Sequence, residues 1–353
     1  MRRCGSMWNR YSATALGCSV ALGLLTWLVV RARANGRRAR VADLVVGAMA
    51  AAAGSILVAF AFATLGMSTF FLFHVFWFVL VAGLPLAAAL VLLRTKATRP
   101  AAVLLASTLV LAGLGVYASV IEPDRLDVER VSVPLAAERH GHDRVRIGVL
   151  SDIQSRYVGD HERRAVELLM AERPDIILVA GDVHQSDEYL AHQDEVRSLL
   201  RGLRAPGGVY LVQGDSDAPW TTPLMVQGTG VQLLDNRVVT VAVRDRQVTI
   251  GGIDVDFASP AARRVEQELE ARPGADDIRL LLTHRPDAVL DLRANSRVDL
   301  VAAGHTHGGQ ISIPFFGPVL TLTGVPRAVA AGGLHALDGR RVYVSKGIGL
   351  ERD

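Results

Sequence analysis

The segment Gly304-His305-Thr306-His307-Gly308-Gly309-Gln310 follows a short apolar run, Leu300-Val301-Ala302-Ala303, of the type found in buried strands. On an extended chain, side chains two residues apart project to the same side, so His305 and His307 can serve one site together. The glycines after them predict a turn. Open α/β sheets place their sites where strands end, and this segment therefore predicts a metal site at a sheet edge.

Three aspartates occupy equivalent places earlier in the chain. Each follows a short apolar run of buried-strand type, and these runs are residues 145–150, 175–180 and 208–212. The aspartates Asp152, Asp182 and Asp215 lie 30 and 33 residues apart. This spacing suits successive strand–helix–strand units, with helices expected near residues 161–173 and 189–203.

A fourth apolar run, residues 278–282, leads into His284. With this residue the chain offers three carboxylates and three imidazoles, which are more ligands than one tetrahedral ion takes. Carboxylate oxygens mixed with imidazole nitrogens suit Mn²⁺, Fe or Zn²⁺ better than Ca²⁺. Two such ions, roughly 3.5–4 Å apart, are the usual clamp for phosphate ester hydrolysis.

The order of these blocks resembles the calcineurin-like metallophosphoesterase superfamily over about residues 144–350. The resemblance implies a four-layer αββα sandwich with a two-metal site on loops at one sheet edge. It implies that one metal takes Asp152 and His307, that Asp182 bridges, and that the other metal takes Asp215, His284 and His305. A metal-activated hydroxide would then attack a phosphate mono- or diester.

The first departure from the family pattern is Gln154, where the family usually has a histidine ligand. An amide oxygen is a neutral and weaker ligand for a transition metal, so the first metal site is expected to be weak or to select a harder ion. His184 is an alternative ligand, although a histidine beside a site is more often exposed or outside the ligand set.

The second departure is Asp215-Ser216, where most members have Asn-His. Aspartate keeps an oxygen ligand and adds a negative charge. Ser216 stands at the position of the usual catalytic histidine, and its hydroxyl is a poor acid near pH 7. Loss of a general acid typically costs about 10² to 10⁴ in rate, which predicts a substrate with a good leaving group.

The third departure is the end of the chain, because relatives usually continue past the segment resembling residues 342–349 with a further loop and strand. Either the fold is trimmed or the sequence is truncated after Asp353. An absent edge strand would expose backbone hydrogen-bonding groups.

The first third of the chain differs in composition from the rest. Four apolar runs approach or exceed the roughly 20 residues that cross a bilayer, and they are residues 11–30, 41–66, 69–93 and 101–121. They predict a four-helix transmembrane region over residues 1–121, a linker over 122–143 and the hydrolase domain over 144–353. A signal peptide followed by buried helices is the alternative interpretation.

Charged residues predict the orientation of these helices. Arginines cluster in the first linker between spans, at positions 31, 33, 37, 38 and 40, and three basic residues lie in the third, whereas the second has no charge. Basic linkers favour the cytoplasm, so the hydrolase domain is expected on the periplasmic or outer side of the plasma membrane. Arg2, Arg3 and Arg10 favour the opposite orientation.

The same division appears in the charge balance. Residues 1–120 carry eleven basic residues and one acidic residue, Asp43, whereas the remainder carries 27 basic and 34 acidic residues. The acidic remainder predicts no nucleic-acid binding. Both cysteines, Cys4 and Cys18, precede or lie in the first span, which excludes a disulfide framework in the domain.

Several other residues have two interpretations. His74 and the His140–His142 segment could be functional, but an interfacial position and a solvated linker are favoured. Arg285 and Lys346 could contact phosphate or be surface charges. Trp220 and residues 311–316 could line an apolar cleft for a lipid or pack in the core.

Together these features predict a membrane-anchored metallophosphoesterase that acts on a phosphate ester, with a lipid or cell-envelope substrate indicated by analogy. The rival prediction is a non-catalytic membrane protein that keeps the fold for structure or ligand sensing. Gln154 and Ser216 favour the rival. The retention of Asp182, His284, His305 and His307 opposes it.

Overall fold

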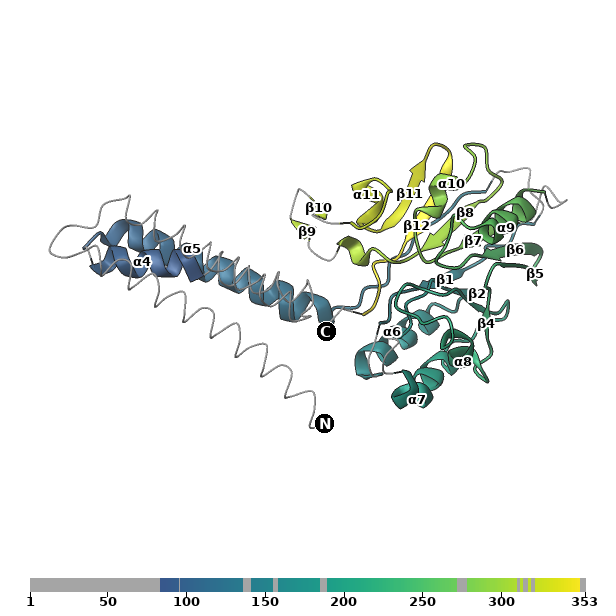
Figure 1. The fold of residues 1–353 in the computed structure, drawn as a ribbon, viewed down its shortest axis with the longest axis horizontal. Coiled ribbons are helices and arrows are strands. Elements are labelled where there is room, and N and C mark those ends of the chain that lie inside the picture. The colour runs from purple at the N-terminus through teal and green to yellow at the C-terminus, as the bar shows by residue number, and fades with distance from the viewer. Residues whose placement is uncertain are drawn as a thin grey trace. The chain divides into compact units, whose positions relative to one another are not determined.

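The computed structural model describes residues 83–94, 96–135, 141–154, 158–184, 189–271, 278–309, 312–313, 317–318 and 321–349 (Figure 1). Its second compact unit spans Leu126–Leu350. The predicted spans 11–30 and 41–66, and most of 69–93, lie outside the described residues, as do His74 and His140.

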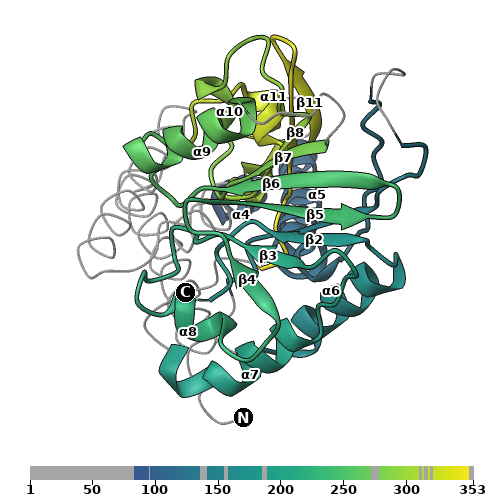
Figure 2. The ribbon, with the colours of Figure 1, turned by 90° about the vertical axis from the view of Figure 1, so that its right-hand side faces the viewer.

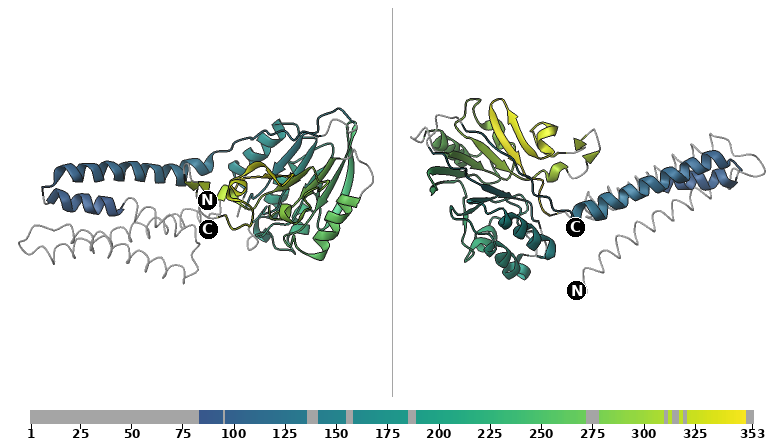
Figure 3. Two further views of the ribbon diagram at one scale, coloured as in Figure 1. Left: turned by 90° about the horizontal axis from the view of Figure 1, so that it is seen from above. Right: turned by 180° about the vertical axis from the view of Figure 1, so that it is seen from behind.

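The described part of the first unit is a helical hairpin. Helix α4 (Leu84–Arg94) turns at Lys96, whose φ of 61° is left-handed, into α5 (Thr98–Val116), and the two helices run side by side (Figure 3). The chain continues as η2 (Tyr117–Ile121) and η3 (Glu122–Asp124). Among the described residues, α5 is the one helix with the length and apolar composition of a membrane span, with a mean hydropathy of 1.7. At 1.5 Å per residue it is about 28 Å long.

The described residues of the second unit form two large sheets and one small two-stranded sheet. The first is parallel, has the order β1-β2-β3-β4, and consists of β1 (Ile147–Leu150), β2 (Ile176–Val179), β3 (Val209–Leu211) and β4 (Val231–Leu233). Its helices are α6 (Asp160–Ala171), α7 (Tyr189–Arg201) and α8 (Thr222–Val226). The expected strands and helices of this half are confirmed to within two residues at each end.

The second sheet has six strands in the order β11-β12-β8-β7-β6-β5. These are β5 (Arg237–Val243), β6 (Arg246–Gly252), β7 (Ile278–Leu282), β8 (Leu300–Ala303), β11 (Gly333–Leu337) and β12 (Arg340–Val344). Strands β6, β7, β8 and β12 are parallel, and antiparallel β5 and β11 form the edges. The helices of this half are α9 (Pro260–Ala271), α10 (Ala288–Asp291) and α11 (Arg327–Ala330). The 3-10 turn η5 (His307–Gly309) and the small pair β9 (Ser312–Ile313) and β10 (Gly317–Pro318) follow β8.

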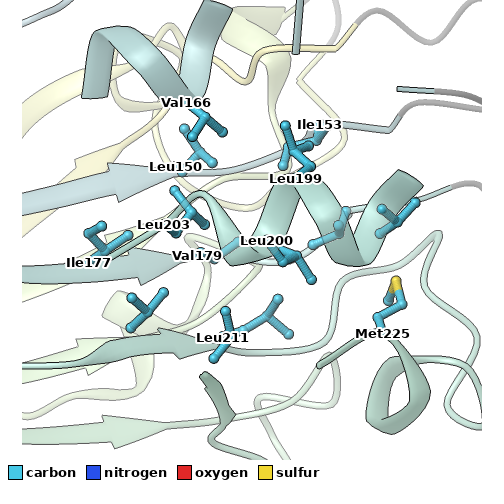
Figure 4. Packing of buried hydrophobic residues seen from close by; sticks show 14 of the residues in the cluster. Leu150, Ile153, Val166, Ile177, Val179, Leu199, Leu200, Leu203, Leu211 and Met225 are labelled. Carbon is cyan, nitrogen blue, oxygen red and sulfur yellow. The ribbon is translucent and has the colours of Figure 1, made fainter. Parts of the chain in front are cut away.

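Strand periodicity explains the layers. In β2, Ile177 and Val179 belong to the core beneath α6 and α7, whereas Ile176 and Leu178 belong to the core between the sheets. Figure 4 shows the first of these cores. A third core packs α9, α10 and α11 on the other sheet. Figure 2 shows the resulting order of helices, sheet, sheet and helices, which confirms the predicted αββα sandwich.

Residues 126–135 lie on this unit. Val133 and Leu135 pack against the core between the sheets. Arg130 donates two hydrogen bonds to the Glu172 carboxylate, at 2.9 and 2.6 Å, and the Tyr343 hydroxyl donates to Glu129 at 3.2 Å. This stretch of the expected 122–143 linker is therefore held by the compact unit.

Candidate metal centre

The predicted ligands all follow the carboxyl ends of strands, and both sheets contribute. Asp152, Asp182 and Asp215 follow β1, β2 and β3 of the four-stranded sheet. His284 follows β7 of the six-stranded sheet, and His305 and His307 follow β8. Parallel strands bring these loops to one edge of the sandwich, as expected for open α/β sheets.

Two groups of ligand atoms result. Asp215, His284 and His305 form one group, and Asp152, Asp182 and His284 form the other, with the ligand atoms of each group within 4.8 Å of one another. Within the first group, His305 Nδ1 lies 2.9 Å from Asp215 Oδ2. His307 Nε2 lies 3.6 Å from Asp152 Oδ1, so this histidine is at the edge of the second group.

His284 links the two groups. Its Nδ1 hydrogen-bonds to the Ala180 carbonyl at 2.8 Å, which directs Nε2 toward Asp182 Oδ2 at 3.5 Å and Asp215 Oδ2 at 3.4 Å. Nε2 is buried and makes no hydrogen bond to a described residue. Burial alone would lower the pKa of His284, but the carboxylates of Asp182, Asp215 and Asp152 outweigh it and raise the pKa to about 10. These carboxylates favour a cation at this point, and a divalent ion on Nε2 satisfies the same need.

The two buried carboxylates are oriented by neighbouring loops. Asp152 accepts hydrogen bonds from the His305 N–H at 3.0 and 3.1 Å. Asp182 Oδ1 accepts from the Ser216 N–H at 2.8 Å. Carboxylate oxygens, imidazole nitrogens and an unpartnered buried Nε2 together fit divalent transition metals, as the sequence predicts.

Gln154 occupies the predicted position of a ligand to the first metal. Its side chain is buried, and Nε2 donates to Asp182 Oδ2 at 2.7 Å. Oε1 makes no hydrogen bond to a described residue. The Gln154 amide therefore donates to the Asp182 carboxylate, and its oxygen is the one side-chain atom that it can offer to a metal.

The backbone at the site is unusual. Five site residues have left-handed φ angles, and they are Asp152 (50°), Gln154 (39°), Asp182 (52°), His305 (73°) and His307 (47°). Such conformations cost about 1–3 kcal/mol each outside glycine and persist where the surroundings impose them. Glycines provide the close packing: a Cβ on Gly304 would clash with Asp152 Oδ2, and one on Gly214 with Asp182. The ligand directions are thus set by the backbone.

Asp217 supports the site and was not predicted as a site residue. Its buried carboxylate accepts hydrogen bonds from the N–H groups of Val183, His184 and Gly214 at 3.0, 3.1 and 3.0 Å. Burial, reinforced by the charge of Asp182, raises the pKa of Asp217 to about 6. Asp217 thereby joins the two loops that carry Asp182 and Asp215. Its place in Gly214-Asp215-Ser216-Asp217 was the available signal.

The remaining predicted residues have varied positions. Ser216 Oγ lies 3.5 Å from the His184 carbonyl, and the His184 side chain is buried but belongs to neither ligand group. Trp220 is 58% exposed, whereas residues 311 and 314–316 lie outside the described residues. His142 is exposed, and its N–H donates to Asp245.

Arg285 pairs with Asp215 through hydrogen bonds from Nε (3.1 Å to each oxygen) and Nη2 (2.7 Å to Oδ1). Burial alone would raise the pKa of Asp215. Contacts with His284, His305 and Arg285 outweigh burial and hold that pKa well below its usual range. Asp215 is therefore a charged candidate ligand.

Comparison with known proteins agrees with this site. Residues 145–309 match the calcineurin-like phosphoesterases. The uncharacterized metallophosphoesterase YkuE of Bacillus subtilis is 30% identical over 246 residues, which cover 67% of this chain and 83% of YkuE. The chain belongs to the calcineurin-like metallophosphoesterase family. The phosphodiesterase YaeI of Escherichia coli is 28% identical over 191 residues, covering 52% of this chain and 67% of YaeI.

A solved structure, the NAD nucleotidase of Haemophilus influenzae, matches with 12% identity and a TM-score of 0.40 over 57% of this chain and 45% of the nucleotidase. Calcineurin-like metallophosphoesterases typically bind two metals, and the Asp and His groups described above are the candidates for holding them here.

Proposed function

We propose that this chain is a membrane-anchored, metal-dependent phosphoesterase. The observation that carries the proposal is that the carboxylates of Asp152, Asp182 and Asp215 and the imidazole of His305 gather around His284, whose Nε2 is buried and makes no hydrogen bond to a described residue. One metal would be held by Asp152, His307 and weakly by Gln154, the other by Asp215, His284 and His305, with Asp182 between them. Bound there, Mn²⁺, Fe or Zn²⁺ supplies Lewis acidity for phosphate ester hydrolysis.

Ser216 supports a proposal about the leaving group of the substrate. Ser216 stands beside Asp215, and its hydroxyl is a poor proton donor near neutral pH. We therefore expect faster turnover of esters whose leaving groups need no protonation. A lipid-linked or cell-envelope phosphodiester at the membrane surface is the substrate class we propose. The name of the relative YaeI, a phosphodiesterase, supports a diester.

For the membrane anchor we propose a multi-pass region over residues 1–121, with spans at 11–30, 41–66, 69–93 and 101–121. Residues 122–143 would link it to the hydrolase domain, 144–353, outside the cytoplasm. The arginine-rich first linker supports this orientation, and α5 supplies one apolar helix of suitable length. In a chain with Cys4 and Cys18 changed to serine, a cysteine at the exposed Gln247 should react with an impermeant maleimide in intact spheroplasts. Labelling only after lysis would place the hydrolase domain in the cytoplasm.

Activity is tested on the full chain in detergent with bis(p-nitrophenyl) phosphate and p-nitrophenyl phosphate across a Mn²⁺ series, with bound metal counted. We expect turnover that saturates with Mn²⁺ and is lost in His305→Ala but kept in His142→Ala, a matched control at an exposed histidine. A folded protein that binds fewer than two ions and hydrolyses neither ester would instead support the non-catalytic alternative, which Gln154 and Ser216 favour.

A further inference from the structure

Arg285 is a charged residue at the metal centre that the ligand set leaves unused. It follows His284 directly, and its side chain remains 39% exposed. Nε and Nη2 both contact the Asp215 carboxylate, with the shortest distance, 2.7 Å, between Nη2 and Oδ1. Such a forked pair fixes the plane of the guanidinium group.

Asp215 places this guanidinium close to the reacting centre. Its Oδ1 receives the short contact from Arg285, while Oδ2 faces His305 Nδ1 at 2.9 Å and His284 Nε2 at 3.4 Å. The guanidinium is therefore separated from the metal-ligand atoms by one carboxylate group. Arg285 Nε also contacts Oδ2, at 3.1 Å, so the guanidinium touches the same oxygen that faces the two imidazoles.

Arg285 keeps donors for another anion. A guanidinium has five N–H groups, and Asp215 takes those on Nε and one on Nη2. Nη1 makes no hydrogen bond to a described residue. Three N–H groups in a fixed plane, partly open to solvent, match the geometry of phosphate oxygens.

The charge of the site leaves a role for an additional cation. Three carboxylates, Asp152, Asp182 and Asp215, leave two divalent ions with one net positive charge, one fewer than a site with a neutral residue at position 215. Ser216 adds none, although it stands where relatives have a histidine. Arg285 restores the missing positive charge.

We propose that Arg285 binds the phosphoryl group of the substrate and stabilises its charge in the transition state, held in place by Asp215. This inference rests on the proposed phosphoesterase function. The Asp215–Arg285 pair then replaces the neutral ligand and the histidine of relatives as a unit. In this proposal Arg285 stabilises negative charge electrostatically and transfers no proton.

The chain offers a matched control. Arg244 contacts Asp175 through the same two nitrogens, Nε at 3.2 Å and Nη2 at 2.9 Å, and its side chain is 44% exposed. Asp175 precedes β2, whereas Asp182 follows it, so this pair lies at the opposite end of the strand from the metal centre. Changing Arg244 removes an equivalent ion pair without touching the site.

The test measures binding of inorganic phosphate by calorimetry to the full chain in detergent, at saturating Mn²⁺ and with bound metal counted. We expect Arg285→Gln to weaken phosphate binding roughly 10- to 100-fold with an unchanged metal count, because charge-assisted hydrogen bonds are lost. Arg285→Lys should lose less phosphate affinity, since lysine keeps the positive charge but cannot form the two-nitrogen contact of a guanidinium. Arg244→Gln should bind phosphate like the wild type.

Equal phosphate affinity in wild type and Arg285→Gln, at equal metal content, would overturn the inference. Loss of metal in Arg285→Gln would also overturn it, by showing that the residue only positions Asp215. If that variant does not fold, the comparison is made with Arg285→Lys. Because the readout is binding, a wild type that binds phosphate through Arg285 but hydrolyses no ester would refute the proposed function and the transition-state role, and would leave only phosphate binding by Arg285. A wild type that binds no phosphate would refute the inference whatever its turnover.

Discussion

The two sheets of the sandwich contribute opposite chemistry to one site. The four-stranded sheet carries the candidate acidic ligands Asp152, Asp182 and Asp215, and the six-stranded sheet carries the imidazoles of His284, His305 and His307. Each sheet alone would hold groups of one kind. Carboxylates without a cation repel one another, and imidazoles alone form a softer, neutral site.

Because each sheet carries a different kind of side chain, the candidate metal centre depends on how the two sheets pack together. The core between them contains Ile176 and Leu178 from one sheet and Leu280 and Leu282 from the other. Burying each of these side chains contributes about 1.5–3 kcal/mol, so apolar packing aligns the two sets of ligands before any metal binds. A metal that binds both sets should in turn stabilise the sandwich.

The largest effect is expected from His284→Ala, which removes one of the imidazoles that the six-stranded sheet supplies. His284 is common to both ligand groups, so the variant should lose both metal occupancy and activity. Since loss of a residue that only supports a ligand costs about 10- to 100-fold in metal affinity, loss of His284 should cost more than ~100-fold. Calorimetric Mn²⁺ titration measures this, and thermal unfolding should show that Mn²⁺ no longer raises Tm.

His142→Ala serves as the control, because His142 is exposed and donates to Asp245 through its backbone N–H, which the substitution keeps. It should retain the affinity and the Mn²⁺-dependent Tm of the wild type. Two ions bound to His284→Ala with wild-type affinity would show that the described groups are not the ligands.

A smaller effect is expected from Gln154→His, which gives the four-stranded sheet an imidazole of its own. A histidine nitrogen is a stronger ligand than the amide Oε1, so the weaker metal should bind about tenfold tighter. The affinity of the second site for its metal should not change. A Mn²⁺ titration fitted with two sites measures the two affinities separately. Weaker binding at the first site would mean that the Gln154–Asp182 hydrogen bond, at 2.7 Å, matters more than ligation.

The smallest effect concerns a carboxyl group without imidazole partners, Glu266 on α9. Burial, together with Asp291, raises the pKa of Glu266 to about 7, whereas histidine and arginine contacts lower that of Asp215. Because the folded-state pKa is raised, the stabilising contribution is complete below about pH 4.5 and is lost as pH rises through about 7. The unfolding free energy of the wild type should therefore fall across this interval.

Glu266→Gln should remove this dependence and raise Tm at pH 8 by a few degrees at most, because an amide carries no charge beside Asp291 and Glu270. Chemical unfolding of metal-free protein between pH 5 and pH 8 measures the slope. An unchanged slope in the variant would assign the pH dependence to other groups.

Much of this arrangement could be predicted from local patterns. The apolar runs 278–282 and 300–303 coincide with β7 and β8, because continuous apolar segments that end in polar residues are typical of buried strands. The ligand blocks follow such strands, so their meeting at one edge is a consequence of parallel topology. The helix α5 was likewise indicated by its composition.

Tertiary contacts were beyond the reach of sequence. Asp217 supports the site because N–H groups from two loops converge on it; its place beside Asp215 indicates that it lies near the site, but does not reveal its contacts with Val183 and His184. The Arg285–Asp215 pair joins residues 70 positions apart. The sequence predicts Gln154 as a ligand, which stays a prediction, whereas its hydrogen bond to Asp182 depends on the backbone conformation of both residues and could not be predicted.

The left-handed backbone of the five site residues has a consequence for selection. Glycine or asparagine would adopt these φ angles at lower cost than glutamine or histidine, so such replacements should make the metal-free fold more stable while removing ligands. A variant library selected for solubility and heat resistance alone should drift away from the present residues at these positions first. The positions where it drifts would mark the metal centre without knowledge of the substrate.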